Sequence, residues 1–327
     1  MEVLIFMVVF AFIIGAIIGS FLNVVALRGL SGESIVFPPS KCPHCGNRIK
    51  PWHNIPILSY LFLRGKCAYC NAPISIQYPI VELLTALTMV GILLKFGPAI
   101  SSIFIFICCC VLIVMSATDF KERVICAGHA VFLIIIGIIY NSYLTFNVFK
   151  TYGDFPLNFE NIMALPITIS ILGIIGSAIV MELLALSGNL FVGKRAFGVG
   201  DTFIAGALGA CFGFMNFLII LAISVAIQVG IIIPNFFKKL ALKKDFNTII
   251  AFVLFIIGAA GFYLGSRTDL FDNFALCIAA SVILLLIGLY TCWRVIRGIK
   301  EDGDIMVLPF GPAMAIAAFI YLFAIAY

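Results

Sequence analysis

One aspartate, Asp201, lies between a glycine-rich turn and a long apolar run in RAFGVGDTFIAGALGACFG, residues 195–213. An ionisable side chain at the edge of a membrane segment costs free energy, so it is a functional hypothesis by default. Gly198 and Gly200 precede it and allow another backbone to approach closely, while the small residues that follow it allow helices to pack tightly. We therefore expect the rest of the chain to act as a scaffold that presents Asp201.

A second aspartate, Asp119, ends another apolar run in SATDFKERV. Two carboxyl groups from different helices can share one proton, so that one acts as a base on water and the other as an acid toward a carbonyl or a leaving amine. This is the chemistry of an aspartic protease. Position alone favours a simpler interpretation of Asp119 as a solvated helix end, and Glu82 and Glu182 compete as partners of Asp201. His129, alone on an apolar run, is interpreted as a packed or hydrogen-bonded residue.

Four cysteines form two CxxC pairs in the polar part of the chain, CPHC from Cys42 to Cys45 and CAYC from Cys67 to Cys70, with 21 residues between the pairs. Such pairs supply four thiolates for a closed tetrahedral site, as in zinc ribbons. A reducing cytoplasm disfavours disulfides, and four soft ligands leave no open position for catalysis. We therefore predict structural zinc at these four cysteines, with His44 as a spacer.

The zinc module has two interpretations. The metal either only replaces the hydrophobic core that a segment of about 50 residues cannot build alone, or it also holds nearby side chains at a fixed distance from the membrane. The side chains concerned are Trp52, His53, Asn54 and Arg64.

The composition is that of a helical membrane protein. The 327-residue chain is 63% hydrophobic and 11% charged, and its mean hydropathy is +1.21. No soluble core needs so many uninterrupted apolar runs. The formal charge of +5 needs no nucleic-acid partner, because basic residues in a membrane protein usually reflect topology. The seven cysteines in or beside apolar runs are interpreted as packing residues.

Apolar runs of helical length predict about ten transmembrane helices. The first is interpreted as a retained helix and not as a cleaved signal peptide, because it is as long as a full span and Glu2 replaces a basic flank. The sixth is too short to cross about 30 Å of hydrocarbon, so it is tilted, re-entrant or sheltered by its neighbours. The predicted spans are 3–27, 79–96, 99–118, 124–146, 161–186, 202–214, 216–237, 248–265, 272–293 and 311–327.

The distribution of basic residues predicts the orientation of these spans. With the N-terminus outside, 17 of the 20 basic residues fall on the inner side, and only Lys95, Lys150 and Arg267 fall outside. The domains expected are a first transmembrane helix at 1–28, a cytoplasmic zinc module at 29–78 and a transmembrane domain at 79–327 with a possible extra helical hairpin at 245–293. Asp119 and Asp201 then share the cytoplasmic side. The predicted fold class is an all-α polytopic membrane protein with a small zinc-ribbon-like module.

Several motifs together resemble those of a known family. GSFLNVVALR at 19–28 ends the first span, and residues 42–87 hold both cysteine pairs and the second span. FGVGD at 197–201 fits a GxGD motif, and LPFGP at 308–312 begins the last span. In this order the motifs resemble the bacterial type IV prepilin peptidase/N-methyltransferase family, membrane enzymes that cut the leader of prepilins and then methylate the new N-terminus.

The resemblance implies that Asp119 and Asp201 are the catalytic aspartates, with Gly198 and Gly200 supporting them. It also implies S-adenosyl-L-methionine as methyl donor and a bacterial inner (cytoplasmic) membrane location. The implied substrates are prepilins or pseudopilins whose apolar N-terminal helix lies in the lipid bilayer and whose leader is cut at the cytoplasmic face. Glu82 is a candidate for binding the substrate N-terminus or the methyl-transfer group, or it is only structural.

The sequence departs from the family pattern in three places. Cys126 and Ala127 follow Ile125 where the family usually has Ile-Pro, Phe203 replaces a common lysine, and two additional spans precede LPFGP. These departures bear on substrate preference more than on the peptidase reaction. The alternatives are a non-catalytic zinc-containing membrane assembly or transport protein and a peptidase that lacks methyltransferase activity. The sequence makes no prediction of the oligomeric state.

Overall fold

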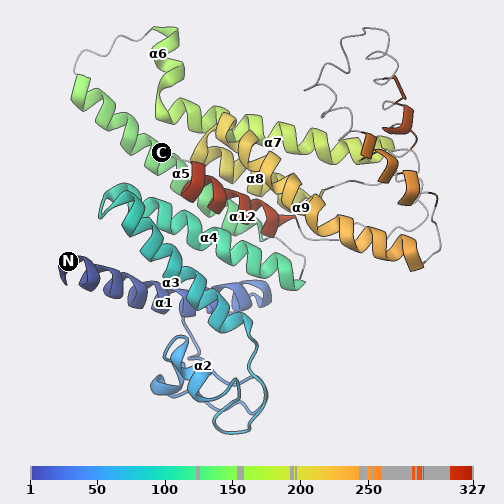
Figure 1. Ribbon diagram of the computed structural model, residues 1–327. Helices are drawn as coiled ribbons and strands as arrows, with labels where there is room; N and C mark the ends of the chain where they lie inside the picture. Colours follow the sequence, from blue (N-terminus) through green and yellow to red (C-terminus); the bar gives the residue numbers. More distant parts are fainter. Residues whose placement is uncertain are drawn as a thin grey trace. The chain divides into compact units, whose positions relative to one another are not determined.

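A computed structural model describes residues 2–122, 126–152, 158–191 and 197–242, residue 195, short helical pieces between 247 and 290, and residues 310–325. Within these residues the regular structure is helical, apart from two isolated bridges in the cysteine module (Figure 1). The chain forms two compact units, of which the first comprises residues 1–184, 197–224 and 309–327. Most of the predicted spans 248–265 and 272–293 lies outside the described residues.

The first and third helices form a close pair in which small residues bring the backbones together. α1 runs Glu2–Ser31 and α3 runs Gln77–Phe96. A Cβ on Gly15 would lie 2.7 Å from the Cα of Ala86, and one on Gly19 would lie 2.7 Å from the Cα of Glu82. Gly15 and Gly19 are therefore a GxxxG contact surface of the kind that joins membrane helices.

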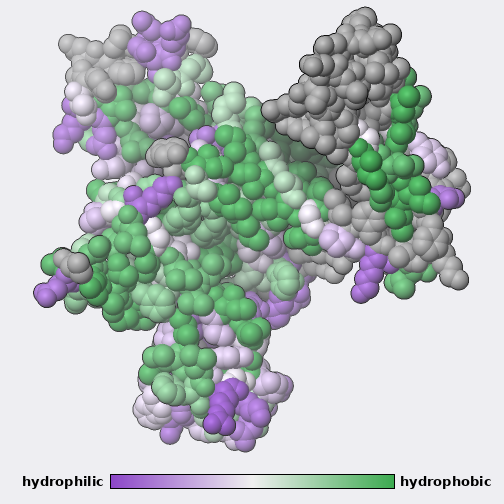
Figure 2. Space-filling view, viewed as in Figure 1, coloured by the Kyte–Doolittle hydropathy of each residue, from purple (hydrophilic) through white to green (hydrophobic). Residues whose placement is uncertain are grey.

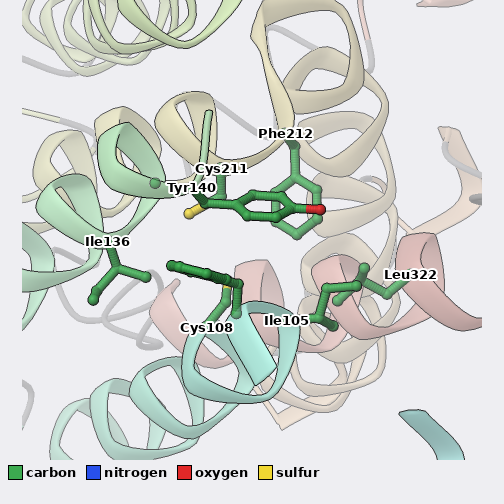
Figure 3. A pocket seen from close by; sticks show the side chains of 9 residues that line it. Ile105, Cys108, Ile136, Tyr140, Cys211, Phe212 and Leu322 are labelled. Carbon is green, nitrogen blue, oxygen red and sulfur yellow. The ribbon is translucent and has the colours of Figure 1, made fainter. Parts of the chain in front are cut away.

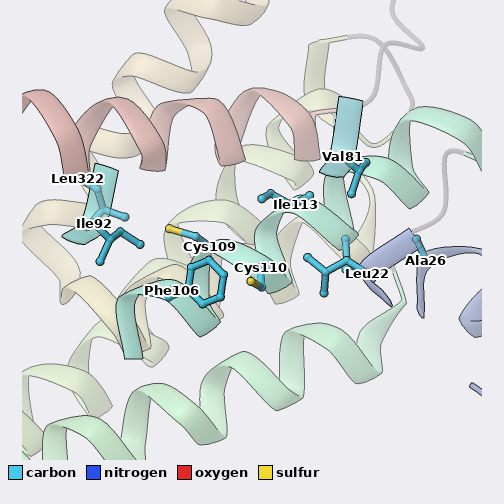
Figure 4. Close-up of a cluster of buried hydrophobic side chains, with 10 residues drawn as sticks. Leu22, Ala26, Val81, Ile92, Phe106, Cys109, Cys110, Ile113 and Leu322 are labelled. Carbon is cyan, nitrogen blue, oxygen red and sulfur yellow. The ribbon is translucent and has the colours of Figure 1, made fainter. Parts of the chain in front are cut away.

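The fourth helix occupies the centre of the first unit. α4 runs Ile100–Glu122 and packs against α1, α3, α5 (Ala127–Tyr152) and the last helix α12 (Gly311–Ile320). α12 continues into a short π-helical turn, η3 (Tyr321–Ile325). Figure 4 shows the buried cluster at this junction, to which α1, α3, α4 and η3 all contribute side chains. Cys109 and Cys110 belong to this cluster and act there as small apolar residues.

The fifth predicted span, 161–186, is divided into two helices. α6 runs Phe159–Ala164, Leu165 is extended with ψ of 136°, and α7 runs Pro166–Phe191. The predicted start was wrong because Pro166 keeps the preceding residue out of the helical region and is itself suited to a first helical turn.

The sixth predicted span is a short helix sheltered by its neighbours. α8 runs Val199–Phe212, and its residues from Ile204 to Ala210 are buried. Its 14 residues extend about 21 Å, which is less than the hydrocarbon thickness of a bilayer. Gly213, with φ of +79°, ends the helix in a conformation that favours glycine, and α9 (Phe214–Leu242) begins at the next residue.

Six described helices, α1, α3, α4, α5, α7 and α9, have a segment that is long and apolar enough to cross a membrane. Figure 2 shows apolar side chains covering much of the helices, while hydrophilic residues lie at helix ends and on part of the module between α1 and α3. The prediction of a polytopic all-α membrane protein is therefore confirmed. The module itself contains two short helices, η1 (Pro51–Asn54) and α2 (Leu58–Phe62).

Candidate active site and metal centre

Asp119 lies in the last turn of α4 and is buried, with 4% of its surface exposed. Its Oδ2 accepts a hydrogen bond of 3.0 Å from the backbone N–H of Gly311, the first residue of α12. A Cβ on Gly311 would lie 2.6 Å from that same oxygen. The carboxyl group is therefore held directly against the start of the last helix, and it is not the solvated helix end that its position in the sequence favoured.

Asp201 is the third residue of α8 and is also buried, with 7% of its surface exposed. Its Oδ2 accepts a hydrogen bond of 3.0 Å from the N–H of Gly198, while Oδ1 has no hydrogen-bond partner in the described structure. Gly198 has an extended backbone, with φ of −72°, that any residue can adopt. Its contribution is therefore its amide group, which caps the helix through the aspartate.

The two aspartates belong to one site. Gly311, whose N–H holds Asp119, also packs on Ile204, three residues after Asp201 in α8. The ring of Phe197, four residues before Asp201, lies 4.8 Å from the ring of Phe310, which immediately precedes Gly311. The segment that precedes Asp201 therefore contacts the residue next to the amide that holds Asp119. Two buried carboxyl groups in this arrangement can share a proton.

The far end of α8 is fixed by helices on both sides. Asn141 of α5 and Ser170 of α7 both donate hydrogen bonds to the carbonyl of Ala210, at 3.1 Å and 2.8 Å. Gly173 of α7 packs against Gly209 so closely that a Cβ on either would collide with the other's carbonyl oxygen. These contacts fix α8, and with it Asp201, relative to α5 and α7.

A small apolar cavity lies where α4, α5, α8 and η3 meet. Its volume is about 40 Å³, and Cys108, Tyr140, Cys211 and Phe212 contribute to its wall (Figure 3). A separate, open apolar groove of about 1,090 Å³ runs along α1 and α4 and has His129 in its lining. His129 is half-buried, and its Nδ1 has no hydrogen-bond partner within the described residues.

Glu82 lies in α3, where that helix meets both α1 and the cysteine module. Its Oε2 accepts a hydrogen bond of 2.7 Å from the N–H of Ile57. Ile57 has φ of +64° and ψ of −53°, and the next amide, that of Leu58, donates back to the carbonyl of Pro56 at 2.6 Å. This is a tight γ-turn of the strained kind. Glu82 therefore attaches the module to the helices at a strained turn.

Glu182, the other predicted competitor, accepts a hydrogen bond of 3.2 Å from the hydroxyl of Thr202, the neighbour of Asp201. It therefore supports the start of α8 from α7. Phe203, which replaces a common lysine, is exposed. Gly200 is half-buried in the first turn of α8.

The cysteine module is built from two turns of the same geometry, 25 residues apart. In the first turn the Cys42 N–H donates to the carbonyl of Asn47, and the Gly46 N–H donates to the carbonyl of Cys42. In the second turn Cys67, Ala72 and Asn71 make the corresponding bonds. Gly46 and Asn71 both have positive φ, at 70° and 58°, which suits glycine and asparagine. Each CxxC pair therefore lies on a reverse turn that directs both sulfurs to one side.

The four sulfur atoms of Cys42, Cys45, Cys67 and Cys70 lie within 4.8 Å of one another, and those of Cys42 and Cys70 are 3.9 Å apart. Four thiolates around a tetrahedral zinc, at about 2.3 Å each, have sulfur atoms about 3.8 Å apart. The residues therefore fit a four-coordinate metal ion. His44 is exposed and lies outside the sulfur cluster, as predicted for a spacer.

The thiols of Cys67 and Cys70 have pKa values that are shifted in opposite directions. The backbone N–H groups of Tyr69 and Cys70 lower the pKa of the Cys67 thiol to about 7. For Cys70, the lowering by the Ala72 N–H is outweighed by desolvation and by the neighbouring sulfurs, which raise the pKa to about 11. Four adjacent thiolates repel one another unless a metal compensates their charge.

Comparison with known proteins identifies the family. Residues 13–96 match the bacterial peptidase A24 N-terminal domain. The prepilin leader peptidase/N-methyltransferase of Neisseria gonorrhoeae is 30% identical over 243 residues, which cover 67% of this chain and 79% of that protein. The chain belongs to the prepilin leader peptidase/N-methyltransferase family.

Other relatives carry the same name. The prepilin leader peptidase/N-methyltransferase of Burkholderia pseudomallei (strain K96243) is 28% identical over 229 residues, covering 62% of this chain and 68% of that protein. That of Myxococcus xanthus (strain DK1622) is 51% identical over 89 residues, 27% of each chain. No solved structure matches the chain. This member of the prepilin peptidase family is therefore an enzyme, and the alternative of a non-catalytic membrane protein is wrong. The matched domain contains the four cysteines and Glu82, whereas Asp119 and Asp201 lie beyond it.

The sequence missed three residues at the site. Gly311 and Phe310 lie in LPFGP, which was noted as a motif without a role. Phe197 lies in FGVGD, where only the glycines and the aspartate were singled out. The signal in the sequence that could have indicated a contact between the two motifs was the phenylalanine that each of them contains.

Proposed function

We propose that Asp119 and Asp201 are the acid pair of an aspartic endopeptidase that removes the leader of prepilin-like proteins. The observation that carries the proposal is that two buried carboxyl groups, on helices far apart in sequence, are each held by a glycine amide. Gly311, which holds Asp119, also packs on Ile204 of the other helix. The names of the relatives support the substrate class, prepilins and, by extension, pseudopilins.

The acid pair would work with one proton shared between its members. The ionised carboxylate accepts a proton from water as the water oxygen bonds to the carbonyl carbon of the scissile peptide. The protonated partner donates its proton to the carbonyl oxygen, which yields a neutral tetrahedral diol. Collapse of the diol breaks the C–N bond, and the departing nitrogen takes the proton that was removed from water. One diol hydroxyl returns its proton to the second aspartate as the new carbonyl forms, which restores the shared proton. The Asp201 Oδ1, which has no partner in the described structure, is suited to face the water.

Cleavage is proposed to occur at the cytoplasmic face of the bacterial inner membrane. Both aspartates lie at helix ends, Asp119 in the last turn of α4 and Asp201 in the first turn of α8. The strong bias of basic residues to one side of the predicted spans supports the inner side for both. The N-terminus would then be outside.

The metal of the cysteine module is proposed to be structural zinc. A set of four thiolates suits zinc, leaves no open coordination position and stabilises a segment too small to fold on a hydrophobic core alone. When bound, zinc would supply folding free energy to the module. Cys42, Cys45, Cys67 and Cys70 would hold it.

The second activity is proposed to be N-methylation of the new terminus with S-adenosyl-L-methionine as donor, as the names of the relatives suggest. Glu82 is the candidate in this chain for binding the substrate amino group or the methyl donor. Its bond to Ile57 supports the structural alternative, in which Glu82 positions the cysteine module.

The peptidase proposal is tested by replacing each aspartate with asparagine in the purified full-length protein. Asp119→Asn and Asp201→Asn should each lower the rate of leader removal by about 10²- to 10⁴-fold, because acid–base catalysis contributes about that much. Leader loss from a prepilin is measured by mass spectrometry, with zinc content and thermal unfolding as checks of folding. Glu122→Gln is the matched control, since Glu122 is a half-exposed carboxylate in the same turn as Asp119 and pairs with Lys121.

A normal cleavage rate in either asparagine variant would reject the acid pair. The same mass measurement, repeated with S-adenosyl-L-methionine, tests the second activity. A methyl-sized increase on the cleaved product supports the bifunctional enzyme, and its absence supports a peptidase that lacks methyltransferase activity.

A further inference from the structure

We propose that Phe310 and Gly311, the residues at the start of α12, form a clamp that positions both catalytic carboxyl groups. This α12 clamp rests on the proposed function, because it assigns a positioning role toward Asp119 and Asp201. It does not add a catalytic residue, since neither clamp residue supplies a side chain that can exchange protons.

Gly311 makes the first half of the clamp. Its N–H donates 3.0 Å to the Oδ2 of Asp119, across a sequence separation of 192 residues. The same residue packs on Ile204, whose Cδ1 would lie 3.3 Å from a Cβ at position 311. Ile204 lies three residues after Asp201, hence on the same face of α8. Gly311 therefore contacts the helices of both aspartates at once.

Phe310 makes the second half. Its side chain is 5% exposed, and its ring centroid lies 4.8 Å from that of Phe197 at an interplanar angle of 56°. Phe197 directly precedes Gly198, whose N–H holds the Oδ2 of Asp201. Aromatic pairs of this kind contribute beyond the area they bury. The ring contact therefore connects the two segments that orient the aspartates. Phe197 precedes the amide that holds Asp201, and Phe310 precedes the amide that holds Asp119.

The geometry at Gly311 gives a specific way to disturb the clamp. The nearest atom to a Cβ at this position, at 2.6 Å, is the carboxyl oxygen of Asp119, which is the end of a side chain and not backbone. Gly311→Ala should therefore push the carboxyl group aside while the helices keep their positions. A displacement of about 1 Å in a catalytic group can cost about 100-fold in rate.

The first experiment compares Gly311→Ala with Gly206→Ala in the purified full-length protein, using leader removal from a prepilin as the assay. Gly206 is also a buried helical glycine, but the nearest atoms to a Cβ there are those of Ile174, at 3.9 Å. Gly311→Ala should lower kcat by about 100-fold with KM and the unfolding temperature close to wild type. Gly206→Ala should behave as wild type in all three measurements.

The second experiment tests the ring contact by a double-mutant cycle. Phe197→Leu and Phe310→Leu should each lower kcat, and the double variant should lose little more than either single variant, since both remove one contact. Phe319→Leu is the control, because Phe319 lies at the other end of α12 and stacks on Phe323 at 6.3 Å. It should leave kcat unchanged.

A normal kcat in Gly311→Ala overturns the clamp. If Gly311→Ala unfolds, the double-mutant cycle decides. The clamp is also overturned if the kcat losses of Phe197→Leu and Phe310→Leu multiply in the double variant, or if these variants change only KM. Asp119→Asn and Asp201→Asn, measured in parallel, separate the two proposals. If they are inactive while Gly311→Ala is normal, the acid pair stands and the clamp fails. If either asparagine variant is active, the proposed function itself fails.

Discussion

Each of the three buried carboxyl side chains in the described structure accepts a backbone N–H. Gly311 donates to Asp119, Gly198 donates to Asp201 and Ile57 donates to Glu82. A backbone donor is fixed by the fold and has no rotamers of its own, so it orients a carboxylate more firmly than a flexible basic side chain would. All three acids are therefore held in a defined orientation.

The residue whose role is most open to experiment is Glu82. Glu82→Ala removes the acceptor for the Ile57 N–H and leaves a half-buried amide without a partner, which should cost about 1 kcal/mol. Faster hydrogen exchange in residues 55–60, measured by mass spectrometry, would show that the module has loosened. Glu82→Gln, which keeps an oxygen acceptor, should retain most of the protection. If Glu82→Ala abolishes methylation without any change in exchange, Glu82 acts on the substrate or the methyl donor instead.

At the scale of helices, glycine decides how closely α8 is held. Gly209 faces the carbonyl of Gly173 and the hydroxyl of Ser177 with no room for a Cβ. The obstacle is backbone, so the helices themselves must move apart if a methyl group is added. The same helix carries Asp201 at its other end, so its packing sets the depth of the carboxyl group.

Gly209→Ala should therefore destabilise the protein by about 1–3 kcal/mol, the usual cost of overpacking a core. It should also slow leader removal, because α8 is displaced. Thermal unfolding in detergent and the cleavage assay measure the two effects. Gly206→Ala, three residues away on the same helix, has room for the methyl group and should change neither. Equal stability of the two variants would mean that α7 and α8 do not pack as described.

At the scale of the whole molecule, we expect the cysteine module and the membrane helices to be stabilised by different interactions. The module would depend on a metal held by its four cysteines, whereas the buried cluster of the bundle consists of side chains from α1, α3, α4 and η3. Cys67→Ser should therefore lose the metal and unfold residues 41–74, while the helical content of the bundle is kept.

Metal analysis and circular dichroism test this separation. Cys211→Ser, which replaces a cysteine within the bundle, is the control and should keep its metal. Leader removal should fall less in Cys67→Ser than in Asp201→Asn, because α12, α5 and α7 hold the acid pair. A collapse of total helicity on metal loss would contradict the separation.

The orientation of the whole chain in the membrane is a further prediction. With 17 of 20 basic residues on the inner side of the predicted spans, a reporter that is active only in the cytoplasm should be active when fused at residues 32 and 242. Fusions of a periplasmic reporter at residues 97 and 153 should be active as well. The opposite pattern would place the aspartates on the outer face and would reject cytoplasmic cleavage.

Much of this protein followed from local sequence. In the bilayer no water is present to bind the backbone, so the N–H and C=O groups of a long apolar run must bond to each other, as they do in a helix. The fold class was therefore predictable from the apolar runs. The cysteine site was predictable too, since each CxxC pair forms its turn from neighbouring residues.

Tertiary structure alone brought Asp119 and Asp201 together and assigned Glu82 and Glu182 other partners. In membrane spans nearly every face is apolar, so the sequence pattern does not reveal which face of a helix points inward. Asp119 is oriented by Gly311, a residue 192 positions away, through a backbone amide that any residue other than proline would possess. Such a contact has no side-chain signature, so only the packing of α12 against α4 could reveal it.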